Sequence, residues 1–183
     1  GAVLPDVEMA GALVLPDAVL NLTRNAKISG TSGGRAHIFI HNTVPTVHSV
    51  KYLELEHMAP MRLDGNGNNI GVLARYPFHF HHSGDNVRGS VIEGLVVKRS
   101  GNHGVVPHAA HGIRWLGVVC YDIFNDCFWW DPGHNTHDNL MEDCVAALVR
   151  YEPDFRGYDI DGFSLQEGNR NLLLHSHPEI VGE

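Results

Sequence analysis

The feature that most constrains this chain is a series of short β-prone segments that recurs at a nearly regular spacing. Gly, Asn, Asp and Pro separate these segments, and no long amphipathic helical pattern interrupts them. His57, His81, His108 and Asp131 each end one segment, at intervals of 24, 27 and 23 residues. Residues 128–133 and residues 163–168 also resemble each other in sequence, at an offset of 35 residues. Such recurrence is typical of stacked repeats, because one repeat cannot bury its apolar face alone.

The sequence therefore predicts an all-β fold, a right-handed parallel β-helix with few or no helices. Each coil should hold about three short strands joined by turns. We expect residues 1–18 to be an N-terminal extension, or a remnant of a preceding domain, and residues 19–183 to form the β-helix domain. The predicted strands cover residues 36–41, 50–57, 76–82, 91–98, 104–108, 113–121, 127–130, 140–149 and 162–166.

Composition narrows the classes of partner. A hydrophobic fraction of 43% and a charged fraction of 19% fit a folded domain. The apolar runs are too short to span a bilayer, so we expect no membrane span in this chain. A formal net charge of −8 argues against nucleic-acid binding, which needs Lys and Arg to neutralise phosphates. The sequence contains 14 histidines, so its charge depends strongly on pH in the acid range.

The three cysteines form no CxxC pair and do not resemble a zinc ribbon. Their odd number leaves either one disulfide and a free thiol or three buried thiols. We favour the second interpretation, in which Cys120, Cys127 and Cys144 act as small buried hydrophobic residues.

Strict alternation of side chains along two segments separates an inner from an outer face. Ile38 and Ile40 share one face of their strand, and His37 and His41 share the other. The segment Phe-His-Phe-His at residues 78–81 repeats this pattern. Because the apolar set must fill the core, the histidines should point outward, onto the surface of one sheet.

Stacking would bring these outward histidines together. Neighbouring strands lie about 4.8 Å apart, and side chains at i and i+2 about 6.6 Å apart, so histidines from adjacent coils can converge on one ion. A single outward histidine is usually an ordinary surface residue, but a His-x-His with further histidines at coil spacing indicates a metal site. The predicted cofactor is a divalent transition metal. Zinc is the first choice, with copper, nickel, iron and manganese left open. The predicted ligands are His37, His79, His81, His108 and Asp131.

Other side chains suit a polysaccharide. Aromatic rings can stack on sugars, although core packing is the commoner role, and Arg can bind a carboxylate with two hydrogen bonds. We expect Arg24, Arg35, Tyr76 and Trp130 to bind substrate. The predicted catalytic residues are Glu56 or Asp85, which would move a proton, and Arg75, which would orient an acidic sugar.

A resemblance to a known family covers roughly residues 20–150. Residues 75–81, followed by Gly84-Asp85, resemble the KYPIHFH…GD signature of the cell-migration-inducing and transmembrane hyaluronidases, the CEMIP family. Further similar stretches are residues 22–25 with 28–30, 33–37, 55–58, 106–108, 119–122, 127–133 and 143–144. Thr31 and Ser32 stand where the animal enzymes have acidic residues. A glycine-rich domain precedes the β-helix in those enzymes, and we expect residues 1–18 to retain at most a remnant of it.

The resemblance implies a secreted or cell-surface β-helix that acts on hyaluronan or a related polysaccharide. It also marks His37, His57, His79, His81 and His108 as family positions. The predicted function is metal-dependent depolymerisation of an acidic polysaccharide, by hydrolysis or by a lyase reaction. The alternative is a non-catalytic carbohydrate-binding or adhesive β-helix whose metal is structural or absent. We also expect that the ends of the solenoid allow self-association, because an uncapped end exposes core.

Overall fold

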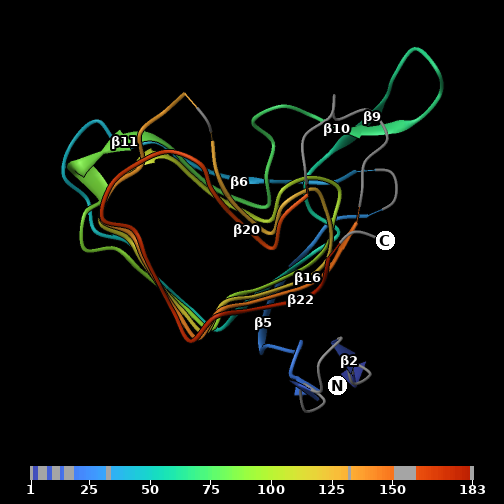
Figure 1. The fold of residues 1–183 in the computed structure, drawn as a ribbon. Helices are drawn as coiled ribbons and strands as arrows, with labels where there is room; N and C mark the ends of the chain where they lie inside the picture. The colour runs from blue at the N-terminus through green and yellow to red at the C-terminus, as the bar shows by residue number, and fades with distance from the viewer. Residues whose placement is uncertain are drawn as a thin grey trace.

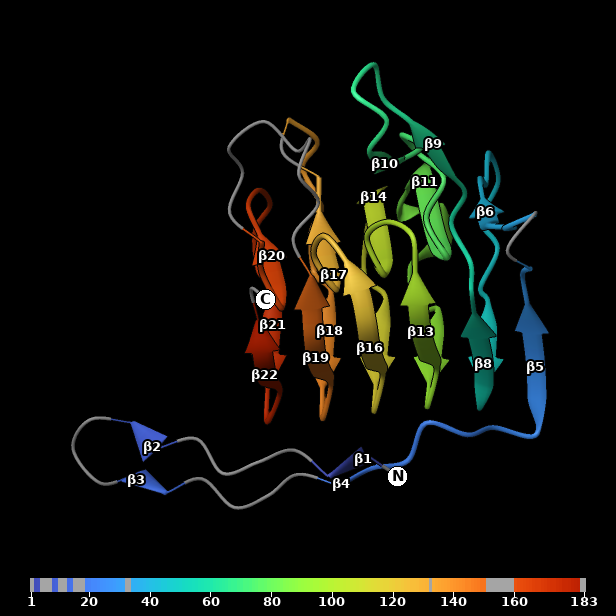
Figure 2. The same ribbon diagram turned by 90° about the vertical axis from the view of Figure 1, so that its right-hand side faces the viewer.

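The computed structural model describes residues 2–3, 8–9, 13–14, 19–31, 34–131, 133–150 and 160–181. Its strands follow one another in triplets, and each triplet gives one strand to each of three parallel sheets. Seen along the stack, the coils superimpose around a common core (Figure 1). Seen from the side, corresponding strands lie next to one another in coil order (Figure 2). The chain is therefore a parallel β-helix, as the repeat predicted.

Sheet 1 carries the candidate site and sheets 2 and 3 close the coil. Sheet 1 contains β6 (Ile38–Ile40), β11 (Phe78–Gly84), β14 (Val105–Ala110), β17 (Phe128–Trp130) and β20 (Phe163–Leu165). Sheet 2 contains β7 (Ser49–Lys51), β12 (Val91–Glu93), β15 (Arg114–Leu116), β18 (Leu140–Glu142) and β21 (Leu172–Leu174). Sheet 3 contains β5 (Ala26–Ser29), β8 (Leu53–Glu56), β13 (Val96–Ser100), β16 (Val119–Phe124), β19 (Val145–Arg150) and β22 (His177–Val181).

The remaining elements are short. Antiparallel pairs join β1 (Ala2–Val3) to β4 (Val19–Leu20), β2 (Glu8–Met9) to β3 (Leu13–Val14), and β9 (Met61–Leu63) to β10 (Asn69–Gly71). One 3-10 turn, η1 (Asp85–Val87), follows β11. No helix among the described residues has the length and hydropathy that crossing a membrane requires. The division at residue 18 stays a prediction.

The strand register confirms most of the predicted repeat. Phe78 pairs with Val105, Val105 with Phe128, and Phe128 with Phe163, which gives the expected offsets of 27, 23 and 35 residues. The predicted first interval, from His57 to His81, is wrong. His57 follows β8 in sheet 3, and the neighbour of β11 is β6, in which Ile38 pairs with Phe78. This coil is longer because it contains the hairpin β9–β10.

Four of the predicted strands are each two strands separated by a corner. The corner residues Tyr52, Gly94, Gly117, Asp143 and His175 all have φ between 46° and 60° and lie between sheets 2 and 3. The N–H of each of the first four donates to a carbonyl of the next coil. A left-handed residue at one corner of every coil therefore turns the chain while it preserves the inter-coil hydrogen bonds. Predicted segments 91–98, 113–121 and 140–149 ran through these corners because apolar residues continue on both sides. Segment 50–57 divides in the same way at Tyr52.

Inward-facing side chains form one continuous core. It includes the fully buried rings of Phe80, Trp115 and Trp130. Cys120, Cys127 and Cys144 are buried free thiols, which confirms the interpretation of the cysteines as core residues.

Candidate metal centre

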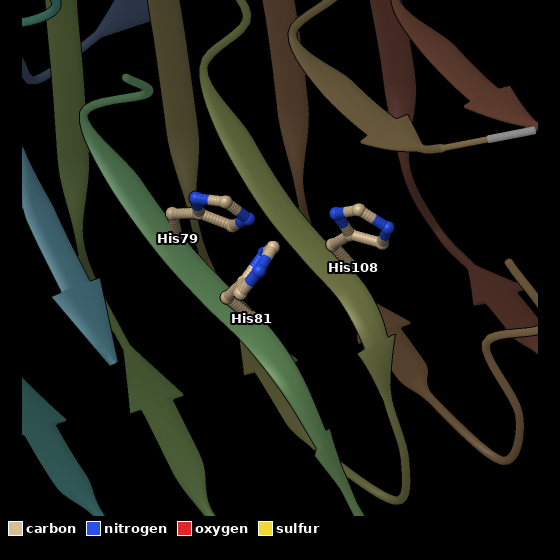
Figure 3. Close-up of side chains that lie close together, drawn as sticks. All are labelled: His79, His81 and His108. Atoms are coloured by element: carbon tan, nitrogen blue, oxygen red, sulfur yellow. The ribbon is translucent and has the colours of Figure 1, made fainter. Parts of the chain in front are cut away.

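Three histidines converge on the outer face of sheet 1. His79 and His81 lie on β11, and His108 lies on the neighbouring β14, where it pairs in register with His81 (Figure 3). One ligand atom from each of the three rings lies within 4.8 Å of those of the other two. The ring centroids of His79 and His108 are each 5.0 Å from that of His81. The alternation within β11 and the 27-residue offset between coils produce this arrangement, as predicted.

A hydrogen bond determines which nitrogen of His79 carries the proton. His79 Nδ1 lies 3.3 Å from the carbonyl oxygen of Ala74, which only accepts, so Nδ1 donates and Nε2 keeps its lone pair. His108 Nδ1 lies 3.4 Å from Asp131 Oδ2. His79 Nε2, His81 Nδ1 and His108 Nε2 are buried without a hydrogen-bond partner among the described residues. A buried polar atom without a partner is costly, and a cation would satisfy all three nitrogens when each presents its lone pair.

The environment keeps these imidazoles neutral. Burial lowers the pKa of His79 to about 3 and that of His108 to about 4, and it also lowers the pKa of His81. The neighbouring histidines add to the shift, because a second positive charge in the cluster would be repelled. Metal ligation requires the neutral ring, so the three side chains are in the protonation state that binds an ion. Three imidazoles suit zinc, copper, nickel or iron and leave a coordination position for a further ligand.

The centre is more enclosed than an exposed sheet face would be. His79 is fully buried, because Tyr76 and the turn before β11 cover it. Tyr76 packs with Val106 and Trp129 in a small cluster on this outer face. Phe39 lies on the other side, with its ring centroid 5.2 Å from that of His79 and 4.9 Å from that of His81, and 43% of it is exposed. The histidines therefore line a covered site that borders solvent near His81 and Phe39.

Two further predicted ligands lie near this centre in different ways. Asp131 contacts His108, as described, and burial raises the pKa of its carboxyl. His37 precedes β6, and the register places Phe39, not His37, beside His79. His37 belongs to neither of the groups of closely spaced ligand atoms that the described residues form. Ligation by His37 and Asp131 stays a prediction.

The structure places the predicted catalytic acids apart from the three histidines. Glu56 lies on β8 in sheet 3, where Lys27 and Arg99 bind its carboxylate. Asp85 follows β11 and accepts hydrogen bonds from Arg88. Arg75 is exposed in the turn that covers His79, and its charge contributes to the lowered pKa of His37.

The predicted substrate-binding residues are mostly engaged within the fold. Arg24 donates to backbone carbonyls that include Gly94, and Arg35 donates to those of Met58 and Arg99. Tyr76 is almost fully buried in the outer cluster, and Trp130 is fully buried in the main core. None of these four roles is tested by these contacts, and they stay predictions.

Sequence reasoning did not single out three residues beside the centre. Phe39 lies on the same face of its strand as His37 and His41, so the alternation already placed it outward. His82 and His134 form a second group with His108. Their ligand atoms also lie within 4.8 Å of one another. The two-residue period of the strands could not predict the positions of His82 and His134, because a bulge in β11 and a loop after β17 position them.

A family model described as the CEMIP beta-helix matches residues 33–167, well over half of the chain. The matched region contains β11 and β14 and therefore all three histidines of the centre. No curated protein and no solved structure matches the chain.

Proposed function

Because this chain belongs to the CEMIP β-helix family, we propose that it depolymerises an acidic polysaccharide with the help of a divalent metal ion. His79, His81 and His108 would hold the ion. The observation that carries the proposal is the convergence of three neutral imidazoles, each with a buried ring nitrogen that has no hydrogen-bond partner in the described part of the chain. Hyaluronan or another uronate-containing polymer is the substrate class that the family supports.

The ion would supply Lewis acidity, which can polarise a sugar carboxylate or lower the pKa of a water molecule. The chain's own groups prepare the site. Ala74 holds the proton on His79 Nδ1, so that the Nε2 lone pair of His79 stays directed to the ion. Asp131 Oδ2 lies 3.4 Å from His108 Nδ1, and Asp131 is a positioning residue in this proposal. Phe39 offers an exposed aromatic ring for a sugar, and Arg75 offers a cation for its carboxylate.

Proton transfer by Glu56 or Asp85 requires either acid to leave its present partners. The ion pairs with Lys27, Arg99 and Arg88 are an observation that favours the alternative function. In that alternative, the same face binds a carbohydrate without cleaving it. A hydrolase and a lyase remain separate possibilities within the first proposal, and the product distinguishes them.

The first experiment measures cleavage by the purified chain after chelation and after return of zinc, copper, nickel, iron or manganese. Substrates are hyaluronan and a panel of other uronate polymers, and the readouts are polymer size and ultraviolet absorbance of an unsaturated product. We expect loss of cleavage on chelation, recovery with one of the metals, and no cleavage by His81→Ala. The double variant His175→Ala/His177→Ala, which changes exposed histidines on another part of the solenoid, serves as control and should keep full activity.

Two outcomes would contradict the proposal. A folded, metal-loaded chain that binds a polymer of the panel without shortening it is a binding module. A chain that cleaves equally well after exhaustive chelation does not depend on a metal. Family membership also supports a secreted or cell-surface location, and we propose that location together with the function.

A further inference from the structure

A second set of metal ligands adjoins the first and shares one residue with it. His82, His108 and His134 bring one ligand atom each within 4.8 Å of the others. The ring centroid of His108 lies 4.5 Å from that of His82 and 4.3 Å from that of His134. His82 is exposed, whereas His79 of the first set is fully buried. We call the set His79, His81 and His108 the inner position and the set His82, His108 and His134 the outer position.

Two local features of the β11 backbone, a bulge and a positive φ, place His82 in the outer position. Within β11 the register shifts between His81 and Gly84, and His82 has a φ of 45°. This bulge interrupts the alternation, so His82 lies beside His81, with ring centroids 4.4 Å apart, instead of pointing into the core. A non-glycine residue at positive φ is strained, so the fold expends free energy to place this imidazole here.

The loop that carries His134 is fastened on both sides of His108. Thr136 Oγ1 accepts a hydrogen bond from Ala109 N at 3.1 Å and donates one to the Pro107 carbonyl at 2.8 Å. Thr136 is fully buried. Ala109 and Pro107 flank His108 in the sequence, so the loop holds His134 next to that ring by direct attachment to β14.

The shared histidine limits how many ions the five residues can hold. A neutral imidazole has one ring nitrogen with a free lone pair, and His108 Nε2 is buried without a hydrogen-bond partner among the described residues. One lone pair binds one ion at a time. The inner and outer positions are therefore alternatives.

We propose that His82, His108 and His134 form an outer metal position through which a single ion passes to and from the inner one. His108 would exchange partners from His82 and His134 to His79 and His81 while it keeps hold of the ion. The inference rests on the proposed metal centre. It adds an exposed route into a site whose first ligand, His79, solvent does not reach.

The test uses Zn²⁺ and four forms of the full chain. Equilibrium dialysis followed by elemental analysis gives the number of zinc ions per chain, and excess EDTA gives the rate of zinc release. Wild type should hold one zinc. His82→Ala/His134→Ala should also hold one zinc and release it several-fold more slowly, because its exit route is lost. His79→Ala/His81→Ala should hold one zinc at the outer position and release it faster. The quadruple variant should hold none.

Controls separate this inference from the proposed centre and from misfolding. His175→Ala/His177→Ala should match wild type, and circular dichroism should show the same β content in every form. If His82→Ala/His134→Ala holds no zinc, the inner position itself fails. If His79→Ala/His81→Ala holds none, or if His82→Ala/His134→Ala releases zinc at the wild-type rate, the outer position is overturned. Two zinc ions per wild-type chain would overturn the exchange of a single ion.

Discussion

At the scale of single residues, one buried acid stands out besides the histidines. Asp126 is 4% exposed, and burial raises the pKa of its carboxyl to about 7. Its Oδ2 lies 3.6 Å from His103 Nδ1, and that nitrogen accepts a hydrogen bond from Asp126 N. The negative charge of the Asp161 carboxylate adds to the rise in pKa, because it disfavours the charged form of Asp126. Asp126 Oδ1 accepts a hydrogen bond from Asp161 N, so the side chain also links two coils.

This acid should make the stability depend on pH in a direction opposite to that of an ordinary carboxylate. Its pKa is about 7 in the folded chain and near 4 in the unfolded chain, so the folded state binds the proton more tightly. The stabilisation is complete below pH 4 and is lost as pH rises through 7. Between pH 4 and 7, we expect the free energy of unfolding to fall more steeply with pH in wild type than in Asp126→Asn. The difference between the two slopes should be at most about 1.4 kcal/mol per pH unit.

Urea unfolding at a series of pH values measures that difference. Asn can still accept the hydrogen bond from Asp161 N, so the substitution removes mainly the titration. Glu167→Gln, which neutralises an exposed acid, should leave the pH dependence of wild type unchanged. Parallel pH profiles for wild type and Asp126→Asn would show that Asp126 is ionised throughout.

At the scale of the elements, buried side chains reinforce the contacts between coils at the corners. Asn139, which precedes β18, is the clearest case. Its Oδ1 accepts a hydrogen bond from Ile113 N in the preceding coil, and its Nδ2 donates to the carbonyls of Ala110 and His137. Its own N–H donates to Asn171 Oδ1 in the following coil. Asn139 is 1% exposed, so water cannot replace these partners.

Asn139→Ala should therefore destabilise the chain by about 1–3 kcal/mol for each buried backbone group that loses its partner. The expected change is a lower urea midpoint in circular dichroism. Asn66→Ala, at the exposed turn between β9 and β10, provides the matched control and should change stability by no more than about 0.5 kcal/mol. Equal midpoints for the two variants would mean that the backbone hydrogen bonds alone hold the coils together.

The arrangement of the strands, bulges and turns explains which parts of the fold and of the candidate site the sequence could predict. Inward Phe78 and Phe80 with outward His79 and His81 follow from the two-residue period of a strand, and the 27-residue offset brings His108 to His81. The positions of the corners could not be predicted. A residue with positive φ, such as Tyr52 or Asp143, does not interrupt the run of β-prone residues in the sequence. Likewise, His82 depends on a bulge, and the enclosure of His79 depends on a turn whose packing has no period.

At the scale of the whole molecule, the last described coil leaves apolar surface uncovered. Sheet 2 aligns Ile92, Trp115, Met141 and Leu173 in one column. The first three are fully buried, but Leu173 is 41% exposed, and its neighbours Leu172 and Leu174 are exposed as well. Exposed core on a sheet edge favours pairing with another chain.

We therefore expect this chain to self-associate in a concentration-dependent way through the edge formed by β21. Sedimentation velocity should detect the larger species, and Leu173→Lys should shift the distribution toward the monomer. Leu73→Lys alters a leucine that is more exposed and lies in the turn before β11, so it should leave the distribution unchanged. A wild-type chain that stays monomeric over the whole concentration range would refute the expectation.

The long connection between β8 and β11, which contains the hairpin β9–β10 and the turn over His79, separates two parts of the site that can change independently. The strand register of the coils positions the histidines. The residues that cover His79 belong to an insertion that leaves this register unchanged. Gly101 shows how closely the two meet, since a Cβ there would lie 2.5 Å from the Met61 side chain. Replacing the hairpin β9–β10 while keeping the turn at Ala74 would leave the hydrogen bond to His79 Nδ1 in place. A solenoid built in this way can acquire new specificities by exchange of one loop, and protein engineers can use the same boundary for grafting.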